Sequence, residues 1–217
     1  MSGGIELTGM ILGTAPAGEY DRRVVLLTKE RGRITAFARG ARRQGSSLLG
    51  AVSPFCFGTF TLYEGRTAYT LVKADISNYF RPLRDDFEGT CYGFYFAELA
   101  EYYGRENLDA SMSLNLLYAA LLALQKTSLP NRLVRYIYEI RLLVINGEFP
   151  QDAADSPQLS ETARYTLRFV FSQPLRSLFS FTLADPVLDE IAKLQDKIRE
   201  RTIDRPIKSL SVLEAVI

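Results

Sequence analysis

Residues 22–43 read RRVVLLTKERGRITAFARGARR and hold the pattern from which the fold follows. From Arg33 to Arg39, apolar residues alternate with others at the period of a β-strand, whose successive side chains point to opposite faces. One face carries Ile34, Ala36 and Ala38, and the other carries Arg33, Thr35, Phe37 and Arg39. The apolar face is suited to line the interior of a small barrel.

Short runs of β-branched and aromatic residues, separated by glycine, occur on both sides of this stretch and indicate further strands. Gly65 suits a hairpin turn because glycine adopts positive φ at little cost. The strands expected before residue 80 are Glu6–Thr14, Arg23–Thr28, Arg33–Arg39, Phe55–Tyr63 and Thr67–Ile76. Short strands in this number and spacing are typical of a closed OB-fold barrel.

Beyond residue 85 the apolar residues recur at the period of α-helices. The expected helices run from Asp85 to Tyr103, from Ser111 to Lys126, from Pro130 to just before Gly147, from Ser160 to Phe171 and from Asp185 to Arg201. The sequence therefore predicts an α+β protein. A five-stranded antiparallel OB-fold barrel in residues 1–80 is followed by an all-helical C-terminal domain in residues 81–217.

Charge is unevenly distributed along this chain of 217 residues, whose formal net charge is only +1. Residues 1–80 contain ten Lys and Arg against six Asp and Glu, whereas residues 81–217 contain sixteen against nineteen. A local basic excess is expected where one domain meets a polyanion. The residues that we expect to contact nucleic acid are Arg22, Arg23, Lys29, Arg31, Arg33, Phe37, Arg39, Arg42 and Arg43.

Phe37 is flanked by two guanidinium groups on the polar face of its predicted strand. Single-stranded nucleic acid uses such an arrangement for phosphate pairing and base stacking. The polar segment Gly40–Ser47 follows and can close over a nucleic-acid backbone without fixing a sequence. The alternative is that these arginines only solvate a surface, which is the usual role of a run of charges.

A second candidate site lies on the helix that begins at Pro130. Arg132, Arg135 and Glu139 fall on one side of this helix, where two arginines could border a groove. A basic rim around an apolar groove suits an acidic peptide that ends in a hydrophobic residue. The alternative, that Arg135 pairs with Glu139 on a solvated face, is equally compatible with the sequence.

Several classes of function are disfavoured by composition. The chain has no histidine, which excludes Ser-His-Asp and Cys-His catalysis and histidine metal sites. Cys56 and Cys91 are too few for a disulfide framework and both lie in apolar stretches, as expected in a reducing compartment. Without a signal pattern or a membrane-spanning run, we expect a cytoplasmic protein with no membrane contact, no catalytic residues, no metal and no cofactor.

Two stretches of the chain closely resemble the RecO family of recombination mediators. Residues 18–28 (GEYDRRVVLLT) and 32–43 (GRITAFARGARR) are similar to the barrel signature of that family, and LGAVSPF at 49–55 continues it. LVRYIYEIRLL at 133–143 and GEFP at 147–150 are similar to its long helix and exit, and IKSL at 207–210 to its closing motif. The resemblance extends from about Ile5 to Leu213.

The resemblance implies a protein of the RecF pathway in DNA repair and recombination. Members bind single- and double-stranded DNA, anneal complementary strands, and act with RecR to load RecA onto DNA coated by single-stranded-DNA-binding protein. The acidic, Phe-ended tail of that protein docks on the helical domain. By position, the family motifs implicate Arg22, Arg23, Arg33, Arg39, Arg42 and Arg43 in DNA contact and Arg132 and Arg135 in tail binding. The resemblance also implies association with the nucleoid during repair.

One departure from the family concerns zinc. Many members carry a four-cysteine zinc element after the Gly-x-x-Pro exit, whereas residues 151–174 contain neither cysteine nor histidine. No zinc is therefore expected. We expect the corresponding region to be a metal-free helix beginning at Ser160 with packed aromatic residues such as Phe169, Phe171 and Phe179.

Two other functions compete with a DNA-handling mediator. An OB-fold adaptor could bind protein or structured RNA, because a fold alone does not fix a function. A nuclease would need an organised carboxylate cluster with magnesium. The basic segment provides neither, and helix capping or solvation explains the acidic pairs Asp85–Asp86 and Glu98 with Glu101.

Overall fold

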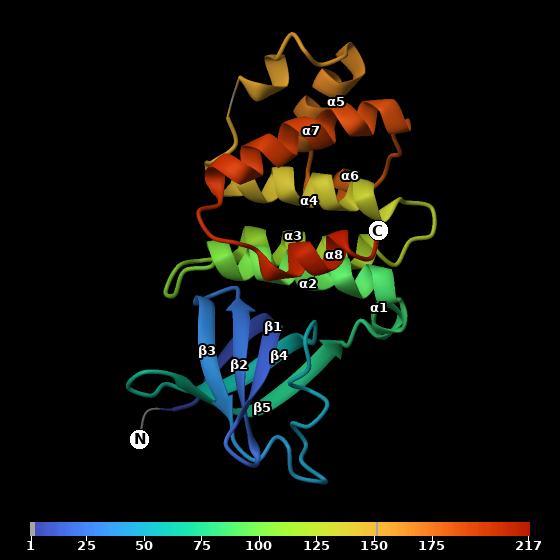
Figure 1. Ribbon diagram of the computed structural model, residues 1–217. Coiled ribbons are helices and arrows are strands. Elements are labelled where there is room, and N and C mark those ends of the chain that lie inside the picture. The colour runs from blue at the N-terminus through green and yellow to red at the C-terminus, as the bar shows by residue number, and fades with distance from the viewer. Residues whose placement is uncertain (1–2, 151) are drawn as a thin grey trace. The chain divides into compact units, whose positions relative to one another are not determined.

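The structure of the protein is a computed structural model that describes residues 3–150 and 152–217. Its strands form a closed barrel in the order β1-β2-β3-β5-β4 (Figure 1). They are β1 (Ile5–Ala17), β2 (Asp21–Thr28), β3 (Gly32–Ala38), β4 (Phe57–Tyr63) and β5 (Tyr69–Asn78). The predicted five-stranded barrel is therefore confirmed, and β1 is longer than predicted because its two halves pair with different strands, β4 and β2.

One strand pair corrects the prediction of a purely antiparallel barrel. β3 and β5 run parallel, with Phe37 beside Thr70, while the other pairs are antiparallel. A closed ring with an odd number of strands cannot alternate in direction all the way round, so at least one parallel pair is unavoidable. The parallel pair falls at β3 and β5 because both have the direction of β1.

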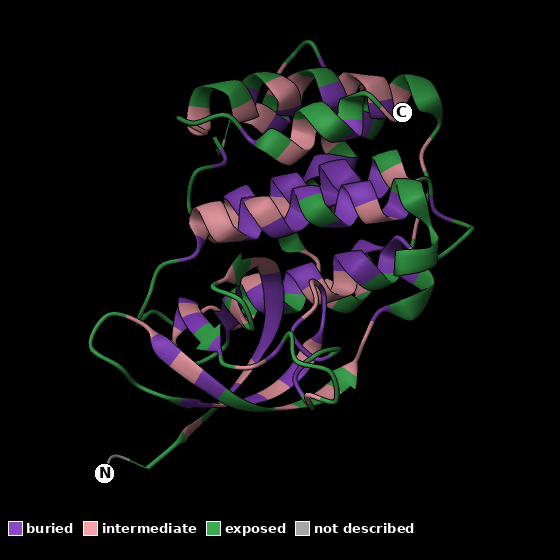
Figure 2. Cartoon of the chain, turned by 60° about the horizontal axis from the view of Figure 1, so that its bottom comes forward, coloured by how far each residue is buried: buried purple, intermediate pink, exposed green. Residues whose placement is uncertain are grey.

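Alternate residues of the strands fill the interior of the barrel, a pattern visible along the strands in Figure 2. β3 contributes Ile34, Ala36 and Ala38 to this core, as its alternation predicts. The connection between β3 and β4 adds Ala41, Leu48, Val52 and Cys56. Of these four, only Ala41 belongs to the polar segment Gly40–Ser47, most of whose residues are exposed, and the apolar anchors follow from Leu48 onward.

Helices account for most of the regular structure after the barrel. They are α1 (Arg81–Asp85), α2 (Phe87–Tyr103), α3 (Ser111–Ala123), α4 (Asn131–Ile145), α5 (Glu161–Ser172), α6 (Leu175–Leu178), α7 (Asp185–Thr202) and α8 (Lys208–Glu214), with a 3-10 turn η1 at Ala153–Asp155. The five predicted helices correspond to α2, α3, α4, α5 and α7, and the short helices α1, α6 and α8 were not predicted. Ser160 caps α5 as predicted, because its Oγ accepts a hydrogen bond from the Ala163 amide at 3.2 Å.

The described residues group by their contacts into two units. One contains the barrel up to Arg84 together with Ala97–Leu114, and the other contains Asp85–Phe96 and the chain from Asn115 onward. Residues 105–110 belong with the barrel because they bond to the β2–β3 turn: Arg105 O accepts from Arg33 N at 3.3 Å, Asn107 N donates to Arg31 O at 2.9 Å, and Ala110 N donates to Lys29 O at 3.0 Å. A functional boundary at residue 80 remains a prediction.

The second unit has a core of helix side chains. Of the four α4 residues that helical spacing places toward the core, Leu133, Ile137 and Ile140 are buried and Val144 is only partly buried. The ring of Tyr138 stacks on Phe96 with centroids 4.3 Å apart, and its hydroxyl donates to the Phe96 carbonyl oxygen at 2.9 Å. In the part of the chain that the structure describes, no helix is both long enough and apolar enough to span a bilayer.

Candidate nucleic-acid interface

The predicted nucleic-acid contacts divide into two groups at opposite ends of the β2–β3 hairpin. Arg22 and Arg23 begin β2 and lie opposite Ala38 and Phe37 near the end of β3. Lys29, Arg31 and Arg33 lie at the turn that joins the two strands, about 20 Å away along a strand of this length. We call the group at the first end the arginine cluster, which consists of Arg22, Arg23, Arg39, Arg42 and Arg43.

Hydrogen bonds join the β1–β2 turn to the segment that follows β3, and these two segments carry most of the arginine cluster. The Gly40 amide donates to Asp21 Oδ1 at 2.7 Å, and the Arg42 amide donates to the Tyr20 carbonyl oxygen at 2.8 Å. Arg42 Nη1 also donates to the Gly18 carbonyl oxygen at 3.4 Å. The β1–β2 turn and the segment after β3 therefore hold arginines that are 20 residues apart in sequence, such as Arg22 and Arg42, at one end of the barrel.

Tyr20 is part of this end of the barrel and was missed by the sequence analysis. The guanidinium carbon of Arg43 lies 5.0 Å from the centre of the Tyr20 ring, within the range of a cation–π contact. A hydrogen bond with Glu19 raises the pKa of Tyr20 above its ordinary value. The available signal was its place in the turn, two residues before Arg22.

Two of the three predicted contacts in the second group, Arg31 and Arg33, have side-chain partners within the protein. Arg33 Nη1 lies 3.4 Å from Glu101 Oε1, and Arg31 Nη1 donates to Asn107 Oδ1 at 3.0 Å. Lys29 has an exposed side chain, but its carbonyl oxygen accepts the Ala110 amide. These bonds attach the β2–β3 turn to residues 101–110. The guanidinium groups of Arg31 and Arg33 are therefore less available to bind a phosphate. Sequence alternation could not show this, because the partners lie about 70 residues further along the chain.

Gly32 makes the close approach between the β2–β3 turn and residues 105–110 possible. Its φ is +63°, and a Cβ atom at this position would lie 2.0 Å from the Arg105 carbonyl oxygen. A residue with a side chain would be strained in this left-handed conformation and would also displace the neighbouring backbone.

The second candidate site contains one exposed and one buried arginine. Arg132 Nη1 pairs with Asp189 Oδ1 at 2.6 Å, and their side chains are 43% and 48% exposed. Arg135 Nε pairs with Glu139 Oε1 at 2.7 Å, and these side chains are only 5% and 2% exposed. Arg135 and Glu139 therefore form the i, i+4 pair that was one of the two readings of the sequence, but they form it in the interior.

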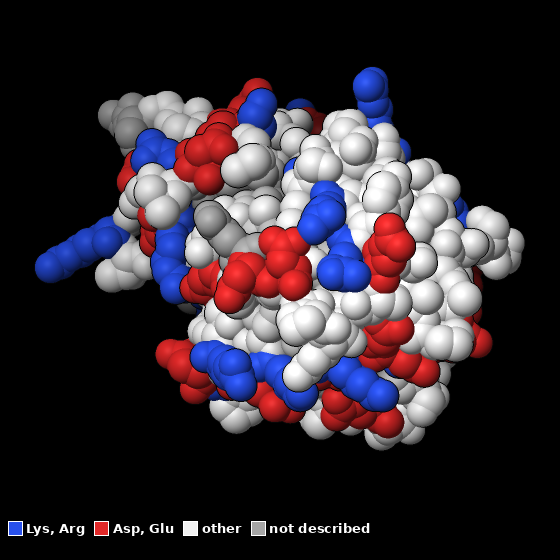
Figure 3. Space-filling model, turned by 90° about the horizontal axis from the view of Figure 1, so that it is seen from above, with Lys and Arg blue, Asp and Glu red and all other residues white. Residues whose placement is uncertain are grey.

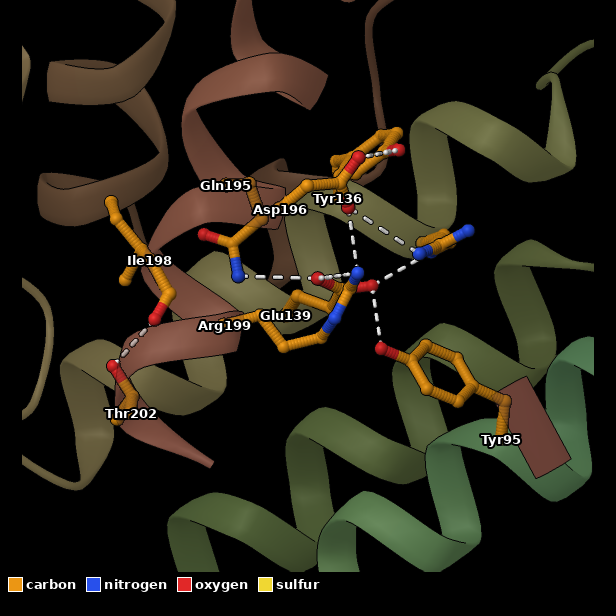
Figure 4. Close-up of polar contacts among 9 residues, drawn as sticks. Tyr95, Tyr136, Glu139, Gln195, Asp196, Ile198, Arg199 and Thr202 are labelled. Atoms are coloured by element: carbon orange, nitrogen blue, oxygen red, sulfur yellow. Dashed lines mark hydrogen bonds and ion pairs between the residues drawn. The ribbon is translucent and has the colours of Figure 1, made fainter. Parts of the chain in front are cut away.

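A network of donors surrounds the carboxylate of Glu139 (Figure 4). Oε1 accepts hydrogen bonds from Tyr95 Oη at 2.8 Å and from Arg135, and Oε2 accepts one from Gln195 Nε2 at 3.1 Å. Arg199 Nη1 lies 3.6 Å from Oε2 and 2.6 Å from Asp196 Oδ1. Burial by itself lowers the pKa of Arg135, but the adjacent Glu139 carboxylate outweighs it and the net pKa is raised. Arg135 is thus held as a cation inside the helical unit.

Aromatic residues pack around α5, in the region where no zinc is expected. Phe149 and Phe171 meet edge to face with centroids 4.9 Å apart, and Phe169 meets Phe181 at 5.2 Å. Arg141 Nη1 donates to the carbonyl oxygens of Val170 and Phe171 near the end of α5. Among the described residues, no group of three or more His, Cys, Asp or Glu side chains is placed to hold a metal ion.

Acidic and basic residues are interspersed on the face of the molecule that Figure 3 shows. One exposed ion pair joins Arg168 to Asp155, whose charged atoms are 2.5 Å apart. The arginine cluster differs, because none of its five members forms an ion pair with a described residue.

Comparison with known proteins gives one consistent family. Residues 1–80 match the family model described as "Recombination protein O N terminal". The chain is 25% identical to the DNA repair protein RecO of Acetivibrio thermocellus, in an alignment that covers 98% of this chain and 97% of that protein. It is 33% identical to the RecO of Alkaliphilus metalliredigens, in an alignment that covers 67% of this chain and 59% of that protein. It is 29% identical to the RecO of Bacillus subtilis, in an alignment that covers 66% of this chain and 56% of that protein. The matched region thus spans nearly all of the first relative and less than two thirds of the other two. Together with the five-stranded barrel and the helices that follow it, these matches show that the chain belongs to the RecO family.

Proposed function

We propose that this protein is a DNA-repair and recombination mediator that binds single- and double-stranded DNA through its barrel. The observation that carries the proposal is the arginine cluster. Its five cations lie at one end of the barrel, form no ion pairs with described residues, and stand next to the exposed rings of Tyr20 and Phe37. A concentration of unpaired positive charge is repulsive in itself and is relieved by a polyanion.

Contact with phosphates explains why such a site would bind DNA of any base sequence, as a repair protein requires. Each phosphate that an arginine neutralises releases counterions, which favours binding and makes it strongly dependent on salt. Contacts of this kind position a nucleic-acid strand without reading its bases. The same charges reduce repulsion between two strands held near one another, so annealing of complementary strands can follow from base pairing.

The proposed partners are RecR, RecA and the single-stranded-DNA-binding protein, and they rest on the family resemblance. For the acidic tail of the latter protein, Arg132 is the better placed of the two predicted residues. Its side chain is exposed and its pairing partner, Asp189, is a surface carboxylate that a peptide carboxylate can replace. Arg135 would act indirectly, because it is buried beside Glu139. Under this proposal, residues 1–80 bind nucleic acid and residues 81–217 bind the partner proteins.

The proposal describes binding and annealing without bond chemistry, in a cytoplasmic protein that joins the nucleoid during repair. The relatives carry the name of a DNA repair protein rather than that of an enzyme, which agrees with the expectation that this chain is not an enzyme. An adaptor that binds structured RNA through the same arginines is the second candidate. Competition between single-stranded DNA and structured RNA at equal nucleotide concentration distinguishes the two.

The decisive experiment is strand annealing on DNA that is coated with single-stranded-DNA-binding protein, with its tail intact or removed. We expect annealing by the wild-type protein on both naked and coated DNA, and a loss on coated DNA when the tail is absent. The triple variant Arg39→Ala, Arg42→Ala, Arg43→Ala should fail on both substrates. Annealing by the triple variant at the wild-type rate would overturn the proposed DNA site, and indifference to the tail would overturn the proposed tail contact.

A further inference from the structure

A row of outward-facing residues crosses the barrel from β2 to β4. Strand register places Arg23 opposite Phe37, Phe37 beside Thr70, and Thr70 opposite Tyr63. The row thus runs through β2, β3, β5 and β4, at right angles to the strands. Only Arg23 and Phe37 belong to the basic segment, and neither Thr70 nor Tyr63 was among the predicted contacts.

The side chains of this row point away from the barrel interior. Paired residues on neighbouring strands project to the same face of a sheet, and their neighbours in sequence project to the other. Val24, Ala36, Leu62 and Leu71, each adjacent to a member of the row, belong to the barrel core. Phe37 is 38% exposed and Tyr63 is 46% exposed, so two aromatic rings stand on the outer surface.

The two rings are separated by one strand. Neighbouring strands lie about 4.8 Å apart, so Phe37 and Tyr63 are about 10 Å apart across the sheet. This separation accommodates bases of the same single strand on both rings. Each ring offers an apolar face to which any base can stack.

The charges around the β4–β5 end of the row largely cancel. Lys73 Nζ lies 2.7 Å from Asp75 Oδ2, which neutralises the lysine on β5. Glu64 and Arg66 follow Tyr63 in the hairpin and are both exposed. The arginine cluster at one end of the row therefore offers charge, whereas Tyr63 at the other end offers a ring without net charge.

We propose that a single DNA strand crosses the barrel along this row, with its phosphates at Arg23 and the rest of the arginine cluster and its bases stacked on Phe37 and Tyr63. The proposal rests on the proposed DNA-binding function and assigns the single-stranded form to a defined track. Duplex DNA gains nothing from the rings, because its bases are already paired and stacked on each other. The row therefore distinguishes single strands from duplexes, while the arginine cluster binds both.

Alanine variants separate stacking from charge. Tyr63→Ala and Phe37→Ala should each weaken binding of a thymidine oligonucleotide roughly 5- to 150-fold, the range that loss of one stacked base produces. Binding of duplex DNA should change less than about twofold, and the salt dependence of oligonucleotide binding should keep its slope because no phosphate contact is lost. The matched control is Tyr165→Ala, which removes a ring that is 68% exposed on α5. Equal losses for single strands and duplexes, or no loss at all, would overturn the track.

A fluorescence experiment tests the same contact without reducing affinity. The chain contains no tryptophan, so Tyr63→Trp introduces a single indole whose emission reports on a base stacked upon it. We expect saturable quenching by the oligonucleotide in the Tyr63→Trp variant and no quenching in Tyr165→Trp. If the Tyr63→Trp variant binds DNA by anisotropy and its emission does not change, the track is wrong and the DNA-binding function stands. If the wild-type protein binds no DNA, the proposed function itself fails.

Discussion

Arg135 and Glu139, one turn apart on α4, form an ion pair of 2.7 Å that is almost completely buried. Tyr95 and Gln195 donate to the same carboxylate, so Glu139 joins α4 to residues from α2 and α7. Removing one partner of a buried pair leaves the other charge uncompensated in the interior, which costs far more than loss of a surface pair. This relationship gives the first prediction.

Glu139→Ala should lower the free energy of unfolding by up to about 3–5 kcal/mol, because Arg135 and Arg199 lose the carboxylate between them and keep only the partly exposed Asp196. Urea denaturation followed by circular dichroism measures this loss. Asp155→Ala is the control, because it breaks the exposed pair with Arg168 and should cost at most about 1 kcal/mol. Similar losses for the two variants would contradict the structural role given to Glu139.

Buried tyrosines should make the protein sensitive to alkali. Burial, assisted by Glu88, raises the pKa of Tyr92 to about 12 from its ordinary value of 10.0. Because the folded state keeps the phenol proton, the associated stability is complete below pH 10 and is lost as the pH rises from 10 toward 12. Tyr92→Phe should reduce the fall in unfolding free energy in this window by about 1.4 kcal/mol per pH unit, the contribution of one proton. Urea titrations between pH 9 and 12 measure the slope, and a slope that Tyr92→Phe leaves unchanged would contradict this role of Tyr92.

The two ends of the β2–β3 hairpin should differ in their contribution to DNA binding. The triple variant Arg39→Ala, Arg42→Ala, Arg43→Ala should weaken binding equally for unrelated sequences and reduce the slope of log affinity against log salt by up to about 3. The double variant Lys29→Ala, Arg31→Ala should change the slope less, by at most about 1, because Arg31 is bonded to Asn107 and only the exposed Lys29 lacks a side-chain partner among the described residues. Fluorescence anisotropy titrations at several salt concentrations measure both. Equal slopes for the two variants would show that the arginine cluster has no special role.

Gly32→Ala should destabilise the barrel unit more than Gly18→Ala. Both glycines have positive φ, +63° and +65°, so each substitution forces alanine into the left-handed region at a cost of about 1–2 kcal/mol. At Gly18 the new methyl group would meet nothing within 4 Å, whereas at Gly32 it would collide with the Arg105 carbonyl oxygen. We therefore expect an additional loss at Gly32, measured as a lower midpoint in urea. A Gly32→Ala protein as stable as Gly18→Ala would mean that residues 105–110 shift without cost.

The exposed ion pair of α4 and α7 predicts how an acidic peptide binds. Arg132→Ala should weaken binding of an acidic peptide that ends in phenylalanine roughly tenfold, the loss of a charge-assisted contact of about 1.4 kcal/mol. Asp189→Asn should leave binding unchanged or strengthen it, because it frees Arg132 from its 2.6 Å partner. Calorimetric titration measures both. Unchanged affinity in Arg132→Ala would exclude Arg132 from the peptide site.

Much of the fold follows from local pattern. Alternation in Gly32–Ala38 predicts which side chains enter the barrel, and helical spacing predicts the burial of Leu133, Ile137 and Ile140, although α4 is buried on its other sides as well. These features depend on periods of two and 3.6 residues, which a single sequence displays directly. The short helices α1 and α6, of five and four residues, were missed because they are too short to show a period.

The sequence by itself determined a basic barrel, a helical remainder and the family to which both belong. Tertiary structure decided which of the basic side chains are exposed and free of protein partners, and so can contact DNA. Strand order brought Tyr63 into one row with Phe37, residues 101–110 engaged Arg31 and Arg33, and helices α2 and α7 enclosed Arg135. The physical reason is that the exposure and pairing of a side chain depend on partners tens of residues away, and a local period carries no information about those partners.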